Sequence, residues 1–257
     1  MNRNIWGFGA LVISGSLALG VSVSAQLRGR DLTDLDAANA GRGRGAPAGK
    51  TPKESAPIDL TGYWVSIVSE DWRFRMLTPP KGDHPDFLLT PAAAKLADAW
   101  DPAKDEAEKD HCKAYGAANI MRVPGRFHIT WADDRTLKIE TDAGMQTRLL
   151  KFAPVAGPAA PPSRQGNSVA QWERKALRVE TSNLLPGYLQ SNGVPHSANL
   201  KMLEYFDVIT EPGGELWLID DEVLTDPANL ARSHKRSTHL RKQADNKGWD
   251  PQPCLVK

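Results

Sequence analysis

The stretch RFHITWADDRTLKIETDAGMQTRLLKF, residues 126–152, decides the fold class. Within it, apolar residues alternate with polar ones in three short runs, which is the two-residue period of half-buried strands. The runs are separated by Asp133-Asp134 and by Ala143-Gly144, residues that are typical of hairpin turns. The stretch therefore predicts three consecutive strands of an antiparallel sheet.

The same alternation continues on both sides of this stretch. Preceding it is DLTGYWVSIVS (59–69), and following it are SVAQWE (168–173), ALRVETS (176–182), LKMLEYFDVI (200–209), ELWLIDDEVL (215–224) and SHKRSTHLRK (233–242). A meander of about nine strands tends to curl and close, because closure removes the exposed edges. The sequence therefore predicts a mainly β fold, an antiparallel meander closing into a lipocalin-like β-barrel. A β-sandwich is the alternative, and an α/β fold is disfavoured because no helix separates the strands after Arg126.

A short helical insertion is expected near residues 90–120. Thr90-Pro91 and Asp101-Pro102 each place an N-capping side chain directly before a proline at the first helical position. The charged residues of the second helix are interpreted as a solvated face. The insertion is the one helical episode in the predicted domain.

Composition excludes several classes of protein. The 257 residues include 32 Lys and Arg against 31 Asp and Glu, whereas a protein built around nucleic acid usually carries a clustered basic excess. No second long apolar run follows the N-terminal one, which argues against a polytopic membrane protein. The content of apolar residues, 40%, is enough for one sizeable core.

The N-terminus has the pattern of a secretory signal peptide over residues 1–25. Arg3 supplies the positive charge, an apolar stretch follows, and small residues end at Ala25 before the expected cut. An uncleaved membrane anchor is the alternative. Residues 26–57 are expected to be a disordered Gly/Ala/Pro-rich linker, which leaves 58–257 as a single domain. The predicted location is periplasmic or secreted, with no stable membrane insertion after cleavage.

Cys112 and Cys254 are the two cysteines of the chain. Exported proteins usually pair their thiols because the compartment is oxidising, so we expect a disulfide between them. Neither cysteine has a partner at the spacing of a metal site, and His111 is merely adjacent to Cys112.

Two further motifs carry a family resemblance. They are WE…LRVET at 172–181 and GVPHSANLKMLEYF at 193–206, followed by Asp226-Pro227. With these motifs, the region from Trp172 to Leu230 resembles a family of exported bacterial proteins of unknown function. The resemblance implies membership of that family but no activity. Relatives often have Gly-Asp after the Trp-Glu pair, where this chain has Arg-Lys.

A polar and aromatic cluster follows the first predicted strand. In extended geometry Asp71, Arg73 and Arg75 would share one face, with Trp72 and Phe74 on the other. If the first face points into the barrel, the arginines could bind a carboxylate or phosphate. If it points outward, it is a solvated face and the aromatic residues belong to the core.

A loop and a strand supply the other acid–base candidates. His196, in a predicted loop after Tyr188, could act as an acid or base, or could instead cap backbone groups. Glu204 shares a strand face with Met202 and Phe206, so it must be paired or have a raised pKa. A buried ion pair with an arginine and an acid that faces the ligand are the two alternatives.

Three histidines on predicted strands, His128, His234 and His239, could in principle converge on a metal. Nothing in the linear sequence brings them together, so no metal and no cofactor is predicted. The candidate catalytic residues are Asp71, His196 and Glu204, and the candidate ligand-binding residues are Trp72, Arg73, Arg75, His128, Tyr188 and Tyr205.

These features support three functional hypotheses. The leading one is a binding protein for a small, largely apolar ligand, with a carboxylate or hydroxyl group, held in the barrel. The second is a cofactor-independent isomerase, lyase or cyclase that uses a histidine or carboxylate. The third is a structural or partner-binding envelope protein. The chain lacks GxSxG, HExxH and CxxC motifs, so common hydrolases are disfavoured. No nucleic-acid partner is expected, and the oligomeric state stays open.

Overall fold

The computed structural model describes residues 50–153 and 160–256. The predicted signal peptide and most of the predicted linker therefore lie outside the described residues. Residues 50–57 belong to the folded unit, because the carbonyl oxygen of Pro52 accepts a 2.8 Å hydrogen bond from Nε1 of Trp172. The folded unit thus begins before residue 58, which corrects the predicted linker boundary. Among the described residues, no helix has both the length and the apolar character needed to cross a membrane.

The strands and helices follow one another as the sequence pattern predicts, with short additions. In chain order they are β1 (Gly62–Ser66), α2 (Trp72–Arg75), α3 (Pro91–Asp98), α4 (Pro102–Ala107), η1 (Lys113–Tyr115), α5 (Ala117–Ile120), β2 (Arg126–Asp133), β3 (Thr136–Thr141), β4 (Ala143–Gly144), β5 (Thr147–Lys151), β6 (Asn167–Glu173), β7 (Ala176–Ser182), β8 (Gly187–Gln190), β9 (Val194–His196), β10 (Lys201–Thr210), β11 (Leu216–Thr225), β12 (His234–Gln243) and β13 (Gln252–Pro253).

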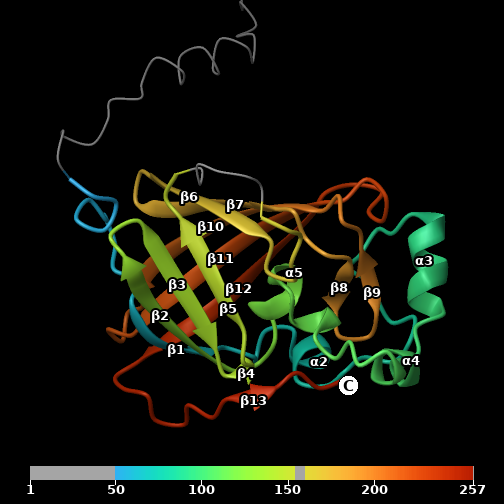
Figure 1. Ribbon diagram of the computed structural model, residues 1–257. Helices are drawn as coiled ribbons and strands as arrows, with labels where there is room; N and C mark the ends of the chain where they lie inside the picture. Colours follow the sequence, from blue (N-terminus) through green and yellow to red (C-terminus); the bar gives the residue numbers. More distant parts are fainter. Residues whose placement is uncertain (1–49, 154–159, 257) are drawn as a thin grey trace, which may run out of the picture. The chain divides into compact units, whose positions relative to one another are not determined.

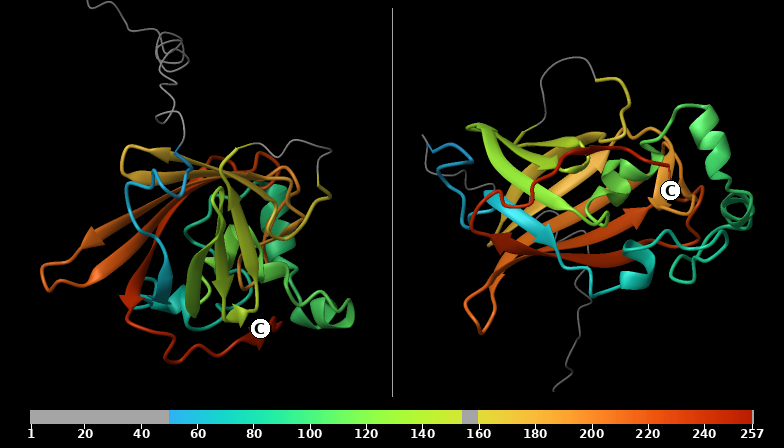
Figure 2. Two further views of the ribbon diagram at one scale, coloured as in Figure 1. Left: turned by 60° about the vertical axis from the view of Figure 1, so that its left-hand side comes forward. Right: turned by 90° about the horizontal axis from the view of Figure 1, so that it is seen from below.

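Nine of these strands form a closed barrel in the order β1-β12-β11-β10-β7-β6-β5-β3-β2 (Figures 1 and 2). The predicted mainly β barrel is confirmed, and closure rules out the β-sandwich. One pairing differs from the predicted antiparallel meander: β5 and β6 are parallel, with Leu150 opposite Ser168. A parallel pair needs a connection of about a dozen residues or more. The Pro/Ala/Gly-rich segment between the two strands supplies that length.

Side chains fill one part of the barrel interior. Along β3, Leu137 and Ile139 are buried while Lys138 and Glu140 are partly exposed, as a two-residue period requires. Every barrel strand adds at least one buried apolar side chain to a single core: Trp64, Phe127, Ile139, Leu150, Ala170, Val179, Phe206, Leu218 and Leu240. The expected ligand cavity is therefore to be sought at another level of the barrel or at its rim.

The helical insertion covers one end of the barrel, together with β8 and β9 (Figures 1 and 2). The predicted caps are present: the Thr90 side chain accepts from the Ala93 amide, and the Asp101 carboxylate accepts from the Ala103 amide. A second apolar cluster holds this cap against the barrel, and it includes Leu189 of β8 and Leu224 of β11.

The disulfide joins Cys112 to Cys254, as predicted, with a sulfur–sulfur distance of 1.99 Å. It links the start of η1 to the segment after β13. Strand β13 itself, directly before this segment, pairs in parallel with β4 through Gln252 and Pro253. The covalent bond and the pairing together fix the C-terminal segment to the cap.

Candidate functional site

A polar layer crosses the barrel interior beyond the apolar core. Arg148 of β5 makes a bidentate ion pair with Glu204 of β10, with nitrogen–oxygen distances of 2.8 and 2.7 Å. Neither side chain has any solvent exposure. The predicted pairing of Glu204 with an arginine is thus found, and this carboxylate faces a partner rather than a ligand.

Two more carboxylates complete this layer. Glu222 pairs with Arg236 at 2.5 Å, whereas neither carboxylate oxygen of Asp220 has a hydrogen-bond partner. Burial, followed by the charges of Glu222 and Glu204, raises the pKa of Asp220 well above its ordinary value. The protonated form of Asp220 is therefore favoured, which leaves two arginines balanced by two ionised carboxylates.

The same three carboxylates are the cluster in the described part of the chain whose geometry could suit a metal ion. One oxygen of each, from Glu204, Asp220 and Glu222, lies within 4.8 Å of the others. Two of the three are already neutralised by arginines in bonding contact. We therefore interpret this layer as a charge-balanced part of the core, and we assign no metal to it.

The barrel closes between β1 and β12, but these two strands pair over only part of the length of β12. Strand β12 is twice as long as β1, and the two pair only from Ser66 opposite Leu240 to Tyr63 opposite Gln243. One more backbone bond, from the Ile67 amide to the His239 carbonyl, extends the contact. The first half of β12 has no strand beside it on this side, so its edge borders a groove.

We call this hollow the seam groove. Its volume is about 640 Å³, which lies within the range of small-molecule sites. It is lined by Asp71, Phe74, Asp86, Phe87, Leu88, Arg122, Gln190 and residues 232–237. Because Arg236 lines the groove and also pairs with Glu222, the floor of the groove is connected to the polar layer inside the barrel.

The seam groove carries an excess of positive charge. Four cations line it, Arg122, Arg232, Lys235 and Arg236, against the two carboxylates Asp71 and Asp86. Asp71 is engaged with Arg122 at 2.9 Å. Arg232 and Lys235 are exposed, and neither forms an ion pair with any residue that the structure describes.

The positive charge of the groove affects the pKa of His234. Burial, and then the charges of Arg236 and Arg122, lowers its pKa to about 4. Its ring stacks on Phe87 with the ring centroids 4.4 Å apart. The groove thus combines cationic side chains with an aromatic surface, and its histidine is neutral near pH 7.

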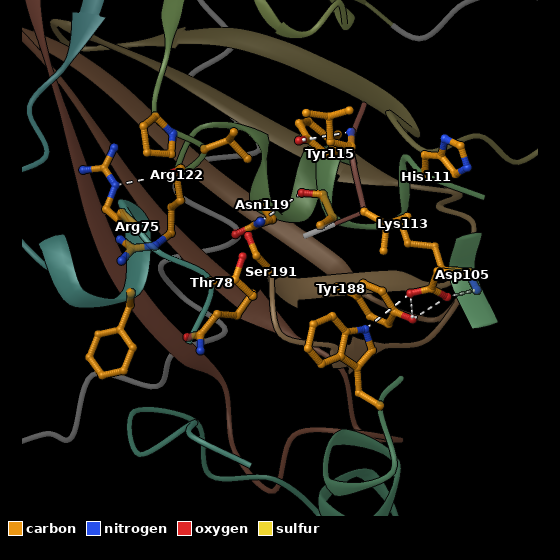
Figure 3. A pocket seen from close by; sticks show the side chains of 18 of the residues that line it. Arg75, Thr78, Asp105, His111, Lys113, Tyr115, Asn119, Arg122, Tyr188 and Ser191 are labelled. Carbon is orange, nitrogen blue, oxygen red and sulfur yellow. Dashed lines mark hydrogen bonds and ion pairs between the residues drawn. The ribbon is translucent and has the colours of Figure 1, made fainter. Parts of the chain in front are cut away.

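A second hollow, the inner pocket, adjoins the seam groove, since Phe74, Arg122 and Gln190 line both. Figure 3 shows Arg75 and Arg122 on one side of the inner pocket and Asp105, Lys113 and Tyr188 on the other. One side of the inner pocket therefore carries two arginines, and the other carries a carboxylate with its hydrogen-bond donors.

Asp105 organises the second side. It accepts a 2.6 Å bond from Lys113 and a 2.8 Å bond from the Tyr188 hydroxyl. Burial and the hydrogen bond to Asp105 raise the pKa of Tyr188, so the hydroxyl stays protonated and donates. Tyr188 is thus a lining residue of the inner pocket, as expected of a ligand-binding candidate, although its hydroxyl is already occupied.

The segment after β1 differs from its predicted extended form. Trp72–Arg75 is the short helix α2, and Asp71 before it has a left-handed backbone with φ 53°. Asp71, Arg73 and Arg75 therefore do not share one face. Trp72 is 60% exposed, and Arg73 pairs with Asp83 at 2.6 Å.

Arg75 is buried and anchors α2. It donates to the carbonyl oxygens of Ile67 at 2.6 Å and Arg122 at 3.0 Å. Burial and the neighbouring Arg122 lower its pKa to about 10, and its Nη2 has no partner. Of the predicted cluster, Asp71, Phe74 and Arg75 line one or both hollows, while Trp72 and Arg73 line neither.

The remaining candidates are dispersed. His196 is buried beside the Ser197 carbonyl, 3.1 Å away, and burial lowers its pKa. His128 stacks on Tyr63, and Tyr205 lies opposite Arg178 between β10 and β7. None of these three lines the seam groove or the inner pocket.

The structure therefore does not bring the acid–base candidates into one cavity. Asp71 borders the seam groove and Arg75 the inner pocket, while Glu204 and His196 are buried elsewhere. The three histidines on the strands are also apart, and His234 stacks on Phe87. His128 stacks on Tyr63, and His239 contacts Glu70.

Sequence reasoning missed most of the groove. Arg122, Arg232, Lys235 and Arg236 were not singled out, although the run SHKRS at 233–237 showed an unusual density of cations. The unpaired length of β12 creates the groove, and that length depends on the partner strand.

The comparisons with known proteins place the chain in no family. No family model, no curated protein and no solved structure matches it. The class defined by the fold and the site is thus a closed β-barrel with a cationic groove at its seam. The resemblance to exported proteins of unknown function stays a prediction.

Proposed function

We propose that this chain is an exported binding protein that holds a small organic anion in the seam groove. The observation that carries the proposal is the pair of exposed cations, Arg232 and Lys235, which have no ionic partner among the described residues and border a groove of about 640 Å³. Arginine and lysine beside an aromatic surface suit a carboxylate or phosphate attached to a planar group.

This proposal modifies the predicted ligand in one respect. An apolar molecule inside the barrel would compete with the packed core, whereas the groove offers cations next to the stacked rings of Phe87 and His234. The carboxylate expected as a minor feature of the ligand thus becomes its main point of attachment.

Export is supported by two features. The N-terminal sequence has the pattern of a signal peptide, and the disulfide between Cys112 and Cys254 suits an oxidising compartment. Both are independent of the groove. Export can therefore be tested separately, by the mass of the mature chain recovered from the host.

Lys235→Gln should weaken anion binding roughly fivefold, since an exposed charge contact contributes up to about 1 kcal/mol. The measurement is isothermal titration calorimetry at low salt, with benzoate and inorganic phosphate as probes. Tighter binding of benzoate would favour a planar carboxylate, and tighter binding of phosphate a phosphorylated ligand. Added salt should reduce the affinity for either, because the attraction is screened.

Arg241→Gln is the matched control. Arg241 is also on β12 and exposed, but it is paired with Glu215 at 3.5 Å and lies outside the seam groove. Its loss should leave the affinity within a factor of two of the wild-type value, as roughly expected for a distant screened charge. Equal weakening by both substitutions, or no heat with either probe, would contradict the proposal.

A further inference from the structure

A serine, a histidine and a glutamate are hydrogen-bonded in sequence on the outer face of β12. Oγ of Ser237 lies 3.0 Å from Nε2 of His239, and Nδ1 of His239 lies 2.7 Å from Oε1 of Glu70. A carboxylate can only accept a hydrogen bond, so in the neutral ring Nδ1 carries the proton and Nε2 is free to accept from the serine. We propose that Ser237 is the nucleophile of an acyl-transfer site, with His239 as its general base and Glu70 as the positioning residue.

Two features of the chain bring these groups together. Ser237 and His239 are two residues apart on one strand, so they point to the same side of the sheet. The bond from the Ile67 amide to the His239 carbonyl holds the end of β1 against β12, and Glu70 follows three residues later. The arrangement thus depends on the same seam that forms the groove.

The serine is accessible to a substrate. Ser237 is exposed and lines the seam groove, and Nη1 of Arg122 lies 3.4 Å from its carbonyl oxygen. A nucleophile, a base and an orienting carboxylate in hydrogen-bonding contact are the parts by which such sites are recognised, whatever their order in the sequence. The absence of a GxSxG motif therefore argues against an α/β-hydrolase, but it does not exclude serine acyl transfer on another fold.

The step on an ester is balanced within the site. Oγ of Ser237 bonds to the acyl carbon as its proton passes to Nε2 of His239. The bond from the acyl carbon to the leaving oxygen then breaks, and the imidazolium returns the proton to that oxygen. Water repeats the sequence on the acyl-serine and releases the acid. The substrate class is an ester of a small anionic acyl group, and that preference alone rests on the proposed function.

The test uses the full-length protein and a neutral fluorophosphonate, which forms an Oγ–phosphorus bond with an activated serine and releases fluoride. Intact mass spectrometry and peptide mapping should show one adduct, on Ser237. Ser237→Ala should abolish it, and His239→Ala should slow labelling by about 10²–10⁴-fold. The matched control is Ser233→Ala, because Ser233 lines the same groove but is bonded to Thr225 at 2.8 Å.

Glu70→Gln distinguishes positioning from a merely structural role. It should slow labelling, whereas Glu70→Asp, which keeps a carboxylate that can accept from Nδ1 of His239, should retain part of the rate. The other charged groups on this face are Lys235 and Arg241 of β12 and Asp221 of β11, opposite Ser237, and all three are unchanged in both variants. A labelling rate of Glu70→Gln equal to that of the wild type would remove Glu70 from the assignment.

Equal labelling of wild type and Ser237→Ala, or labelling at Ser233, would overturn the inference. The outcome is independent of anion binding, because the probe is neutral. His239 does not line the seam groove, so His239→Ala should lose labelling and still bind benzoate in the calorimeter, which separates the two proposals. If the wild type is labelled at Ser237 but binds neither benzoate nor phosphate, the proposed function alone is overturned.

Discussion

Arg148→Met should lower the free energy of unfolding by about 3–5 kcal/mol, because it leaves a buried carboxylate without its partner. Glu204 has no solvent exposure, and both of its oxygens bond to Arg148. The side chain that replaces the arginine cannot donate, so Glu204 must either stay charged in the core or take up a proton. Urea denaturation, with the midpoint and slope fitted together, measures the change.

Two further variants separate charge from packing. In the double variant Arg148→Met with Glu204→Leu no charge is left unpaired, so most of the lost stability should return. Arg178→Met removes a partly exposed arginine that pairs with Glu180 and, at 3.7 Å, with Glu173, and it should cost less than about 1 kcal/mol. An Arg148→Met protein as stable as the wild type would show that the polar layer is not closed to water.

Replacing both cysteines with serine should destabilise the fold by about 5 kcal/mol, an upper value from the loss of a constraint on the unfolded chain. Cys112 and Cys254 are 142 residues apart in sequence, so the bond closes a loop that spans most of the folded unit. The segment after β13 should also become more accessible to proteases, because pairing with β4 involves only Gln252 and Pro253.

Reduction provides the control for this variant. Dithiothreitol should move the unfolding midpoint of the wild type towards that of the double-serine protein and leave the latter unchanged. A variant within about 1 kcal/mol of the wild type would mean that packing of the C-terminal segment holds without the bond.

Local patterns were enough to predict the strands, because alternation is a property of each strand alone. Residues 126–152 form the three predicted strands, and Thr90 caps a helix as its sequence indicates. The parallel pairing of β5 with β6 could not be obtained in this way, because strand direction depends on where the intervening segment leads. The partner of Glu204 likewise became visible only when β5 and β10 were placed in one barrel.

The segment WRFR at 72–75 shows why a local pattern can mislead. Its alternation of aromatic and basic residues suits a strand, yet the chain turns at Asp71 and forms a helix. Tertiary contacts decide this, since Arg75 reaches the carbonyl oxygens of Ile67 and Arg122. The candidate cluster built on strand geometry was therefore wrong as a single face, although Asp71, Phe74 and Arg75 border the hollows.

The seam groove and the serine–histidine–glutamate arrangement both arise because strand β12 is longer than its partner β1. Strand β12 continues beyond β1, so its free half exposes His234 and Arg236 to the groove and Ser237 to solvent. A sequence shows the spacing of Ser237 and His239, but it does not show that Glu70 lies beside them. Both proposed activities therefore lie along the part of β12 that β1 does not pair with.

The pKa of His234 tests the central claim, that the seam groove binds an anion, most directly. The charged groups around this ring are Arg236 of β12, Arg122, Glu222 of β11 and Asp86, and burial with the two arginines holds its pKa at about 4. A bound anion offsets the arginine charge and favours the protonated ring, so the pKa must rise. The measurement is NMR titration of the histidine ring signals, assigned with His234→Gln, without and with inorganic phosphate. The account predicts a pKa of about 4 that increases on adding phosphate, and a pKa that phosphate leaves unchanged would contradict it.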